Sequence, residues 1–268
     1  MNRIRWAFAD GVVIAKRNVI KIKRVPEVLV FVLISPIMFV LLFAYVFGSS
    51  IEIPGGSYRE FLIGGVFAQT VIFGATFTGA GLADDMQKGI IDRFRSLPMS
   101  RSAVVFGRTA SDVVYNVLSL TIMALSGLVV GWRAHNGIGS TLAGLGLLLL
   151  FAYAFSWIMA YVGLLVPSVE VINNASFIVI FPLTFIANTF VPVENLPTVL
   201  RVFAEWNPVS AVTQAARELF GNIPPGTPEP TAWPLRNPSA YTLIWVVIII
   251  AVFAPLAVRR YRRSKARI

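Results

Sequence analysis

The sequence predicts an all-α integral membrane protein with six transmembrane helices. Of its 268 residues, 56% are hydrophobic and only 13% are charged, a composition far from that of soluble domains. Six apolar stretches without charge are long enough to cross a hydrocarbon core about 30 Å thick. No repeat or long linker divides the chain, so residues 1–268 are expected to form a single transmembrane domain.

The elements follow from the positions of these apolar stretches. The expected crossings are residues 28–47, 61–83, 104–132, 140–166, 172–191 and 238–258. Before the first crossing, residues 3–24 mix aromatic and aliphatic side chains with seven basic residues, which is typical of a helix lying in the membrane interface. Between the fifth and sixth crossings, residues 194–220 contain two short amphipathic patterns separated by Asn207 and Pro208. These two patterns predict a re-entrant helical hairpin on the outer side.

The segment between the second and third crossings is predicted to be a short helix over residues 86–98. Ile90, Ile91, Phe94 and Leu97 repeat at helical spacing, and Pro98 ends the pattern. A loop that only joins two crossings needs no such apolar face. The pattern favours docking to a soluble partner, with a helix resting on lipid headgroups as the alternative.

The distribution of Lys and Arg predicts the orientation. Eighteen of the 23 basic residues fall in the N-terminal segment, in the stretch that runs from the loop between crossings two and three to Arg108, and in the tail. Because basic residues favour the cytoplasmic side, both termini are expected there, in a multi-pass protein of the cell's inner (plasma) membrane. The net charge of +10 is explained by this topology and by contact with anionic membrane lipids, so we do not expect nucleic-acid binding.

Several kinds of chemistry are excluded or disfavoured by the sequence. The chain has no cysteine and one histidine, His135, so no cysteine or histidine-cluster metal site can form. The phosphate-binding pattern G-x-x-x-x-G-K-[ST] is also missing. We therefore expect no catalytic residues, no bound metal and no cofactor on this chain. One embedded pair, Arg108 and Asp112, lies at helical i, i+4 spacing and is interpreted as a structural lock rather than a gate.

Three stretches carry a resemblance to a known family: "KIKRVPEVLVFVLISPIMFVLLFAYVFG", "QKGIIDRFRSLPMSR" and "FVPVENLPTVLRVFAEWNPVS". In this order they resemble the permeases of type-2 ABC exporters, most closely the daunorubicin/doxorubicin-resistance subgroup. The resemblance implies that residues 86–98 are the coupling helix that receives force from a cytoplasmic ABC ATPase subunit, which binds the ATP and magnesium. The coupling residues carried over are Lys88, Gly89, Asp92, Arg93, Arg95, Leu97, Pro98 and Arg101. Gln87 departs from the acidic residue of many relatives, and Asp84 or Asp85 is the alternative acidic partner.

Six helices are few around a large pore, so a second permease copy is expected, either identical or a sister chain, with the route between the two. The side chains proposed to line this route are Gln69, Thr70, Phe73, Phe77, Asn173, Asn174 and Asn188. Such a surface suits a hydrophobic or amphipathic cargo, a drug or a lipid, better than a small ion. The alternatives are export of a lipid-linked polysaccharide and, from other classes, a membrane enzyme or a scaffold.

Overall fold

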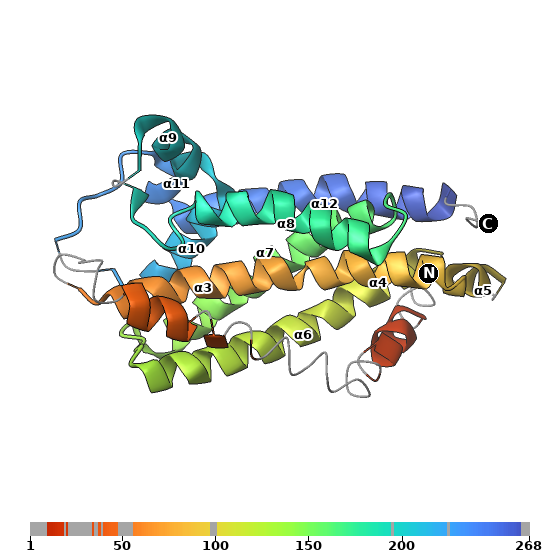
Figure 1. The fold of residues 1–268 in the computed structure, drawn as a ribbon, viewed down its shortest axis with the longest axis horizontal. Helices are drawn as coiled ribbons and strands as arrows, with labels where there is room; N and C mark the ends of the chain where they lie inside the picture. The colour runs from red at the N-terminus through yellow and green to blue at the C-terminus, as the bar shows by residue number, and fades with distance from the viewer. Residues whose placement is uncertain are drawn as a thin grey trace.

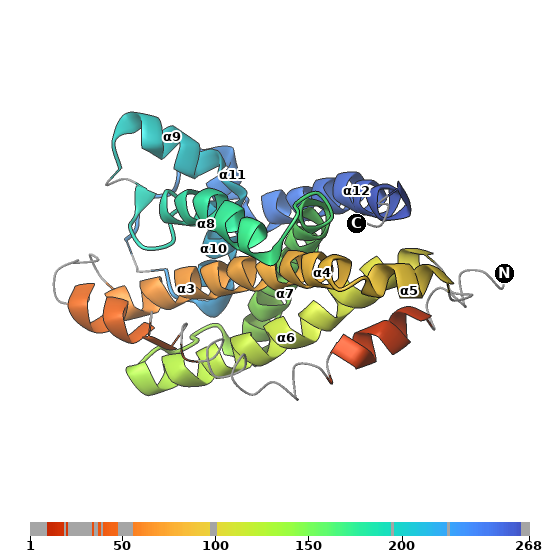
Figure 2. The same ribbon diagram turned by 45° about the vertical axis from the view of Figure 1, so that its right-hand side comes forward.

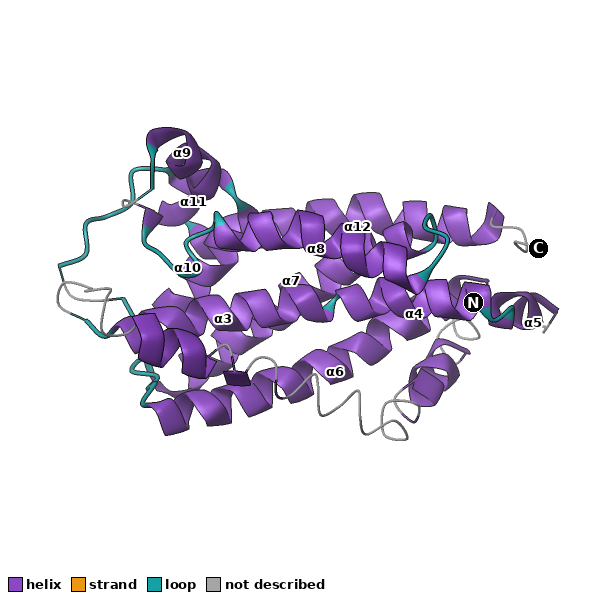
Figure 3. Cartoon of the chain, in the orientation of Figure 1, coloured by secondary structure: helices purple, strands orange, loops and turns teal. Residues whose placement is uncertain are grey.

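The computed structural model describes residues 10–18, 20, 34, 37–38, 40–47, 56–96, 101–193, 196–223 and 226–263. Within these ranges, all the regular elements are helices (Figure 3), which confirms the all-α prediction. The N-terminal helix, residues 10–18, belongs to the predicted interfacial segment. Of the first predicted crossing, 28–47, residues 28–33, 35–36 and 39 lie outside the described residues. Its end is described as a π-helical turn, η1 (Phe43–Phe47).

Four helical stretches in the described ranges are long and apolar enough to cross a membrane. The first combines α3 (Tyr58–Gly74) and α4 (Thr76–Gln87), which meet at a turn residue, Ala75. The others lie in α6 (Arg101–Val130), α7 (Gly137–Gly163) and α12 (Pro238–Arg263). These four spans show an integral membrane protein.

The predicted fifth crossing, 172–191, corresponds to a shorter helix. Helix α8 (Val169–Phe185) has 17 residues, and the chain then turns over residues 186–190. Its length is about 26 Å at 1.5 Å per residue, near the lower limit for a helix that spans a membrane. Ser168 starts the helix by accepting a hydrogen bond from the Val171 backbone N–H at 3.3 Å.

Helix α7 lies at the centre of the bundle and packs against α12, α4, α6 and α10 (Pro208–Phe220). Close packing with α4 depends on glycine, because a Cβ atom at Gly79 would lie 2.6 Å from the Met159 carbonyl oxygen. Gly163 of α7 faces Gly79 in the same way. Small residues at such crossings let helix backbones approach each other in membranes.

The two ends of the bundle carry different elements (Figures 1 and 2). The N-terminal helix, α5 (Ile90–Ser96) and the C-terminal end of α12 lie at one end. Helices α9 (Thr198–Trp206), α10 and α11 (Trp233–Arg236) lie at the other. This second end is held by three rings, Phe67, Trp132 and Phe220, whose centroids are 5.4 to 5.8 Å apart with edge-to-face geometry.

Candidate functional site

The segment expected to couple to a partner begins with a tight turn. Helix α4 ends at Gln87, and α5 begins at Ile90, so the helix predicted over 86–98 starts four residues later than expected. Gly89 has a φ of 64°, in the left-handed region that glycine adopts with little strain. Its N–H donates to the Met86 carbonyl at 3.1 Å. The helix is thus interrupted at Lys88 and Gly89 between the membrane-spanning stretch and α5.

Helix α5 packs on the bundle through its apolar side. Ile91 is buried in a cluster that includes Leu82, Val104 and Tyr261, and Phe94 is half-buried against the same cluster. Arg93 is exposed. Helix α5 is thus attached to the end of the bundle through Ile91 and Phe94, while Arg93 reaches the surface.

The other predicted coupling residues lie around this turn. Lys88 is exposed and forms an ion pair with Asp84 at 2.8 Å, and the hydrogen bond that it donates to Asp84 raises the pKa of Lys88. Asp92 and Arg95 belong to α5, and Arg101 is the first residue of α6. Leu97 and Pro98 lie outside the described residues.

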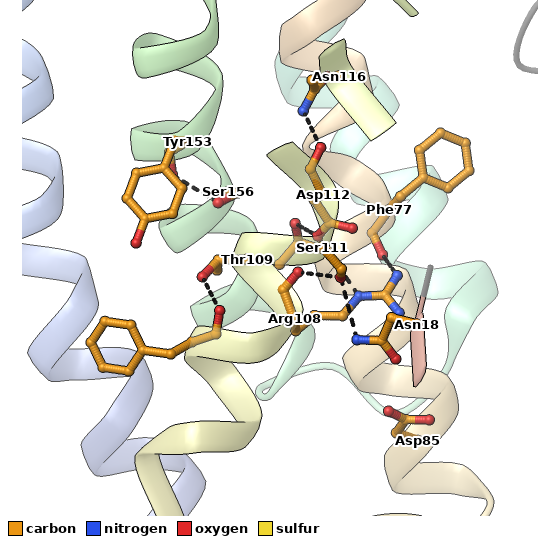
Figure 4. A network of polar contacts seen from close by, with 12 residues as sticks. Asn18, Phe77, Asp85, Arg108, Thr109, Ser111, Asp112, Asn116, Tyr153 and Ser156 are labelled. Atoms are coloured by element: carbon orange, nitrogen blue, oxygen red, sulfur yellow. Dashed lines mark hydrogen bonds and ion pairs between the residues drawn. The ribbon is translucent and has the colours of Figure 1, made fainter. Parts of the chain in front are cut away.

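A polar ladder joins α4 to α6 just inside the same end of the bundle (Figure 4). The term covers Gly74, Thr78, Gly81 and Asp85 on the α3–α4 stretch and Arg108, Ser111, Asp112 and Asn116 on α6. These residues are spaced so that each set lies on one helix face. The ladder therefore sets a stripe of small and polar residues on the α3–α4 stretch against a polar stripe on α6.

Asp112 is the centre of the ladder. Its carboxylate accepts a hydrogen bond from the Thr78 hydroxyl and lies 3.7 Å from Arg108 Nε, while its backbone carbonyl accepts from Asn116 Nδ2 at 3.0 Å. Arg108 also donates from Nη2 to the Phe77 carbonyl at 2.7 Å. Gly81 makes this possible, since a Cβ atom there would overlap the Arg108 guanidinium. The predicted Arg108–Asp112 pair thus lies within a larger network that also includes α4.

The ladder extends to the N-terminal helix. Arg17 Nη2 lies 2.9 Å from Asp85 Oδ2, and Asn18 Nδ2 donates to the Ser111 hydroxyl at 3.3 Å. Neither contact follows from sequence reasoning, because the partners are 68 and 93 residues apart. The available signal was the helical spacing of Thr78, Gly81 and Asp85, which places a small or polar residue on one face of the second span.

Comparison with known proteins identifies the family. The family model of ABC-2 type transporters matches residues 11–220, most of the chain. The chain belongs to the ABC-2 type transporter family. It is therefore a permease, the non-catalytic membrane subunit of an ABC transporter.

Individual relatives of this ABC-2 permease include proteins associated with drug resistance. The chain is 31% identical to the daunorubicin resistance ABC transporter permease protein DrrB1 of Streptomyces coeruleorubidus, over 93% of this chain and 85% of that protein. It is 23% identical to a probable doxorubicin resistance ABC transporter permease protein DrrC of Mycobacterium tuberculosis, over 72% and 66% of the two chains. A putative transport permease, ycf38 of Porphyra purpurea, is 22% identical over 78% and 73%.

The residues proposed to line a cargo route do not share one surface of the permease. Gln69 and Asn188 are buried inside the bundle, and Asn188 donates from Nδ2 to Gln214 at 3.3 Å. Thr70 and Phe73 are half-buried, whereas Phe77, Asn173 and Asn174 are exposed. Phe73 lies near the exposed ring of Phe177, at 6.4 Å between centroids. The structure thus separates an inner pair from an outward-facing group on α3, α4 and α8.

The predicted hairpin over 194–220 contains two unlike helices. In α10, Asn207 caps the start by accepting from the Val209 N–H at 2.9 Å, and most of the helix is buried. Arg217 fixes it by donating to the carbonyls of Phe61 and Thr189 at 2.8 and 3.0 Å. In α9 the apolar side chains are instead exposed: Val199, Leu200, Val202, Phe203 and Trp206.

Proposed function

We propose that this chain is the membrane subunit of an ATP-driven exporter that moves hydrophobic or amphipathic compounds out across the plasma membrane. A separate cytoplasmic ATPase docks on α5 and supplies the work, with ATP and magnesium bound on the ATPase. Export of drug-like compounds is inferred from the names of the relatives. A lipid-linked polysaccharide is the second candidate cargo, and vesicle uptake assays with both cargo classes discriminate between them.

The observation that supports ATPase docking is the geometry of α5. The break at Lys88 and Gly89 sets off a short helix with exposed Arg93, at the same end of the bundle as the N-terminal helix and the end of α12. A helix of this kind can fit into a cleft of a soluble partner. Since closure of the ATPase must be converted into a movement of the bundle, a stiff element at the contact is needed.

The proposed topology has six crossings, with both termini and α5 in the cytoplasm and with α9 to α11 on the outer side. The excess of basic residues on the segments assigned to the cytoplasm supports this orientation. The exposed apolar face of α9 supports its insertion into the outer leaflet as part of a re-entrant hairpin. A second permease copy completes the transport route, and co-purification of two differently tagged copies tests this pairing.

Substitutions in α5 test the proposal. In a purified permease–ATPase complex, Asp92→Ala or Arg93→Ala should lower cargo-stimulated ATP hydrolysis by about tenfold, the effect of losing one charged contact of roughly 1.4 kcal/mol. The control is Arg133→Ala, an exposed arginine at the opposite end of the bundle, which should leave hydrolysis unchanged. Unaltered coupling in both α5 variants would show that the ATPase docks elsewhere.

A further inference from the structure

Arg17 contacts two other elements from its place on the N-terminal helix. Its guanidinium forms an ion pair with Asp85, near the end of α4, at 2.9 Å. The same guanidinium lies 5.0 Å from the centre of the Phe94 ring on α5, within range of a cation–π interaction. Asp85 is buried, so this contact is shielded from water on the α4 side. One side chain therefore bridges the two helices that flank the Gly89 turn.

The turn itself provides little to fix the direction of α5. Only Lys88 and Gly89 separate the two helices, and a Cβ atom at Gly89 would meet no neighbour within 4 Å. A helix of seven residues is too short to be stable alone. The orientation of α5 thus depends on tertiary contacts, of which Ile91 in the bundle and Phe94 beneath Arg17 are described.

The N-terminal helix is held firmly enough to act as an anchor. Asn18 is buried and donates to Ser111 on α6 at 3.3 Å. Ile14 is buried and lies against Gly107, where a Cβ atom would come within 2.6 Å of the Ile14 Cβ. Arg17 also donates to its neighbour Asn18 from Nη2 at 3.1 Å, which restricts the guanidinium. The anchor is thus connected to α6 as well as to α4.

We propose that Arg17 is a positioning residue that fixes the direction of α5 relative to α4, and so sets how much of the work of the ATPase reaches the bundle. The ion pair holds the guanidinium at the end of α4, and its flat face supports the Phe94 ring on α5. Without it, α5 pivots about Gly89, and closure of the partner moves α5 instead of the membrane helices. This inference rests on the proposed function, in which α5 is the site of ATPase docking.

The experiment uses the full-length permease, which has no native cysteine that could interfere with labelling. Nitroxide labels at Arg93→Cys on α5 and Glu170→Cys at the start of α8 report the direction of α5, since both positions are exposed. Doubly labelled chains are diluted with unlabelled ones so that distances within one copy dominate. Three substitutions are compared in this doubly labelled protein: Arg17→Gln, Arg17→Lys and, as the control, Lys16→Gln at the exposed neighbouring position.

With Arg17 in place, the proposal predicts a narrow distribution of the distance between the labels at positions 93 and 170. This distribution should broaden in Arg17→Gln and stay narrow in Lys16→Gln. Arg17→Lys should recover part of the narrowing, because lysine keeps the charge opposite Asp85 but lacks the planar group over Phe94. In unlabelled complexes with the ATPase, Arg17→Gln should lower transport per ATP hydrolysed about three- to tenfold while the ATPase still co-purifies.

Two results overturn the inference. A distribution that stays narrow in Arg17→Gln shows that other contacts orient α5, whatever α5 does. A broadened distribution with unchanged transport per ATP shows that the orientation of α5 does not set coupling. Failure of the proposed function is a separate outcome. In that case the Asp92→Ala and Arg93→Ala variants transport cargo at the wild-type rate, while the label distances still report the direction of α5.

Discussion

At the scale of single residues, the buried polar groups of α6 decide how the second and third spans fit together. Asp112 is 3% exposed, yet its carboxylate has two described partners, Thr78 on α4 and Arg108 on its own helix. A charge placed within a membrane helix is stable only with such compensation. Arg108 provides part of this compensation, and Gly81 leaves the space that its side chain needs.

The first prediction concerns this pair. Asp112→Ala leaves the Arg108 guanidinium without its carboxylate and the Thr78 hydroxyl without its acceptor, so the permease should lose about 3 kcal/mol of stability. Arg108→Ala with Asp112→Ala should cost less than the two single losses combined, because the double variant has no isolated charge. Unfolding of the detergent-solubilised protein measures the loss of stability in the two single variants and in the double variant. Strictly additive losses would contradict a coupled pair.

The second prediction concerns Glu218 on α10, at the opposite end of the bundle. Burial raises the pKa of Glu218 above its usual range. Because the folded state binds the proton more tightly than the unfolded state, this group favours folding below about pH 4.3, and the contribution is lost as pH rises through the folded pKa.

Glu218→Gln should therefore stabilise the permease at neutral pH, by less than about 1 kcal/mol since the side chain is only half-buried. The gain should vanish near pH 4, where both variants carry an uncharged group. Thermal unfolding of both proteins from pH 4 to 8 measures this difference. A Glu218→Gln protein that is less stable than the wild type at neutral pH would contradict the sign.

At the scale of elements, the Gly89 turn separates a membrane-spanning helix from the helix proposed to dock. Replacement by any other residue strains the turn, because L side chains disfavour a φ of 64° even where space is free. The turn thus requires glycine for its backbone and not for packing.

The third prediction follows from this requirement. Gly89→Ala should cost about 1 kcal/mol of stability and reduce ATPase coupling, because the strained backbone at position 89 would oppose the contacts of Ile91 and Phe94 that orient α5. The matched control is Gly139→Ala in α7, where a Cβ atom also meets nothing within 4 Å but φ is not positive. There alanine should stabilise the helix slightly. Equal effects of both substitutions on unfolding and on cargo-stimulated ATP hydrolysis would argue against a strained turn.

The elements that sequence reasoning predicted best are those with a clear local signal. Apolar length identified the spans that became α3–α4, α6, α7 and α12. The sequence pattern predicts the start of α5 at Met86, because Lys88 and Gly89 do not interrupt the apolar spacing of the segment. The left-handed backbone of Gly89 is a property of the folded turn. The ladder contacts of Asp85 and Ser111 depend on which helix faces meet, and one sequence does not contain that information.

At the scale of the whole molecule, the two ends of the bundle have different proposed roles. Helix α5, the N-terminal helix and the end of α12 share one end of the bundle, and α9 to α11 share the other. In the proposed function, the first end receives the ATPase and the second faces outward. The polar ladder and Arg17 connect α5 to the spans α3–α4 and α6. A movement imposed on α5 would then be carried into the membrane by contacts that already exist.

The measurement that tests this claim most directly is sidedness labelling of single cysteines. Arg93→Cys on α5 and Glu229→Cys, an exposed position in the 226–232 segment before α11, are introduced into the naturally cysteine-free chain. A membrane-impermeant maleimide is applied to right-side-out and inside-out vesicles. The account predicts labelling of position 93 only in inside-out vesicles and of position 229 only in right-side-out vesicles. Labelling of position 93 from the outside would contradict it, since no cytoplasmic ATPase could then reach α5.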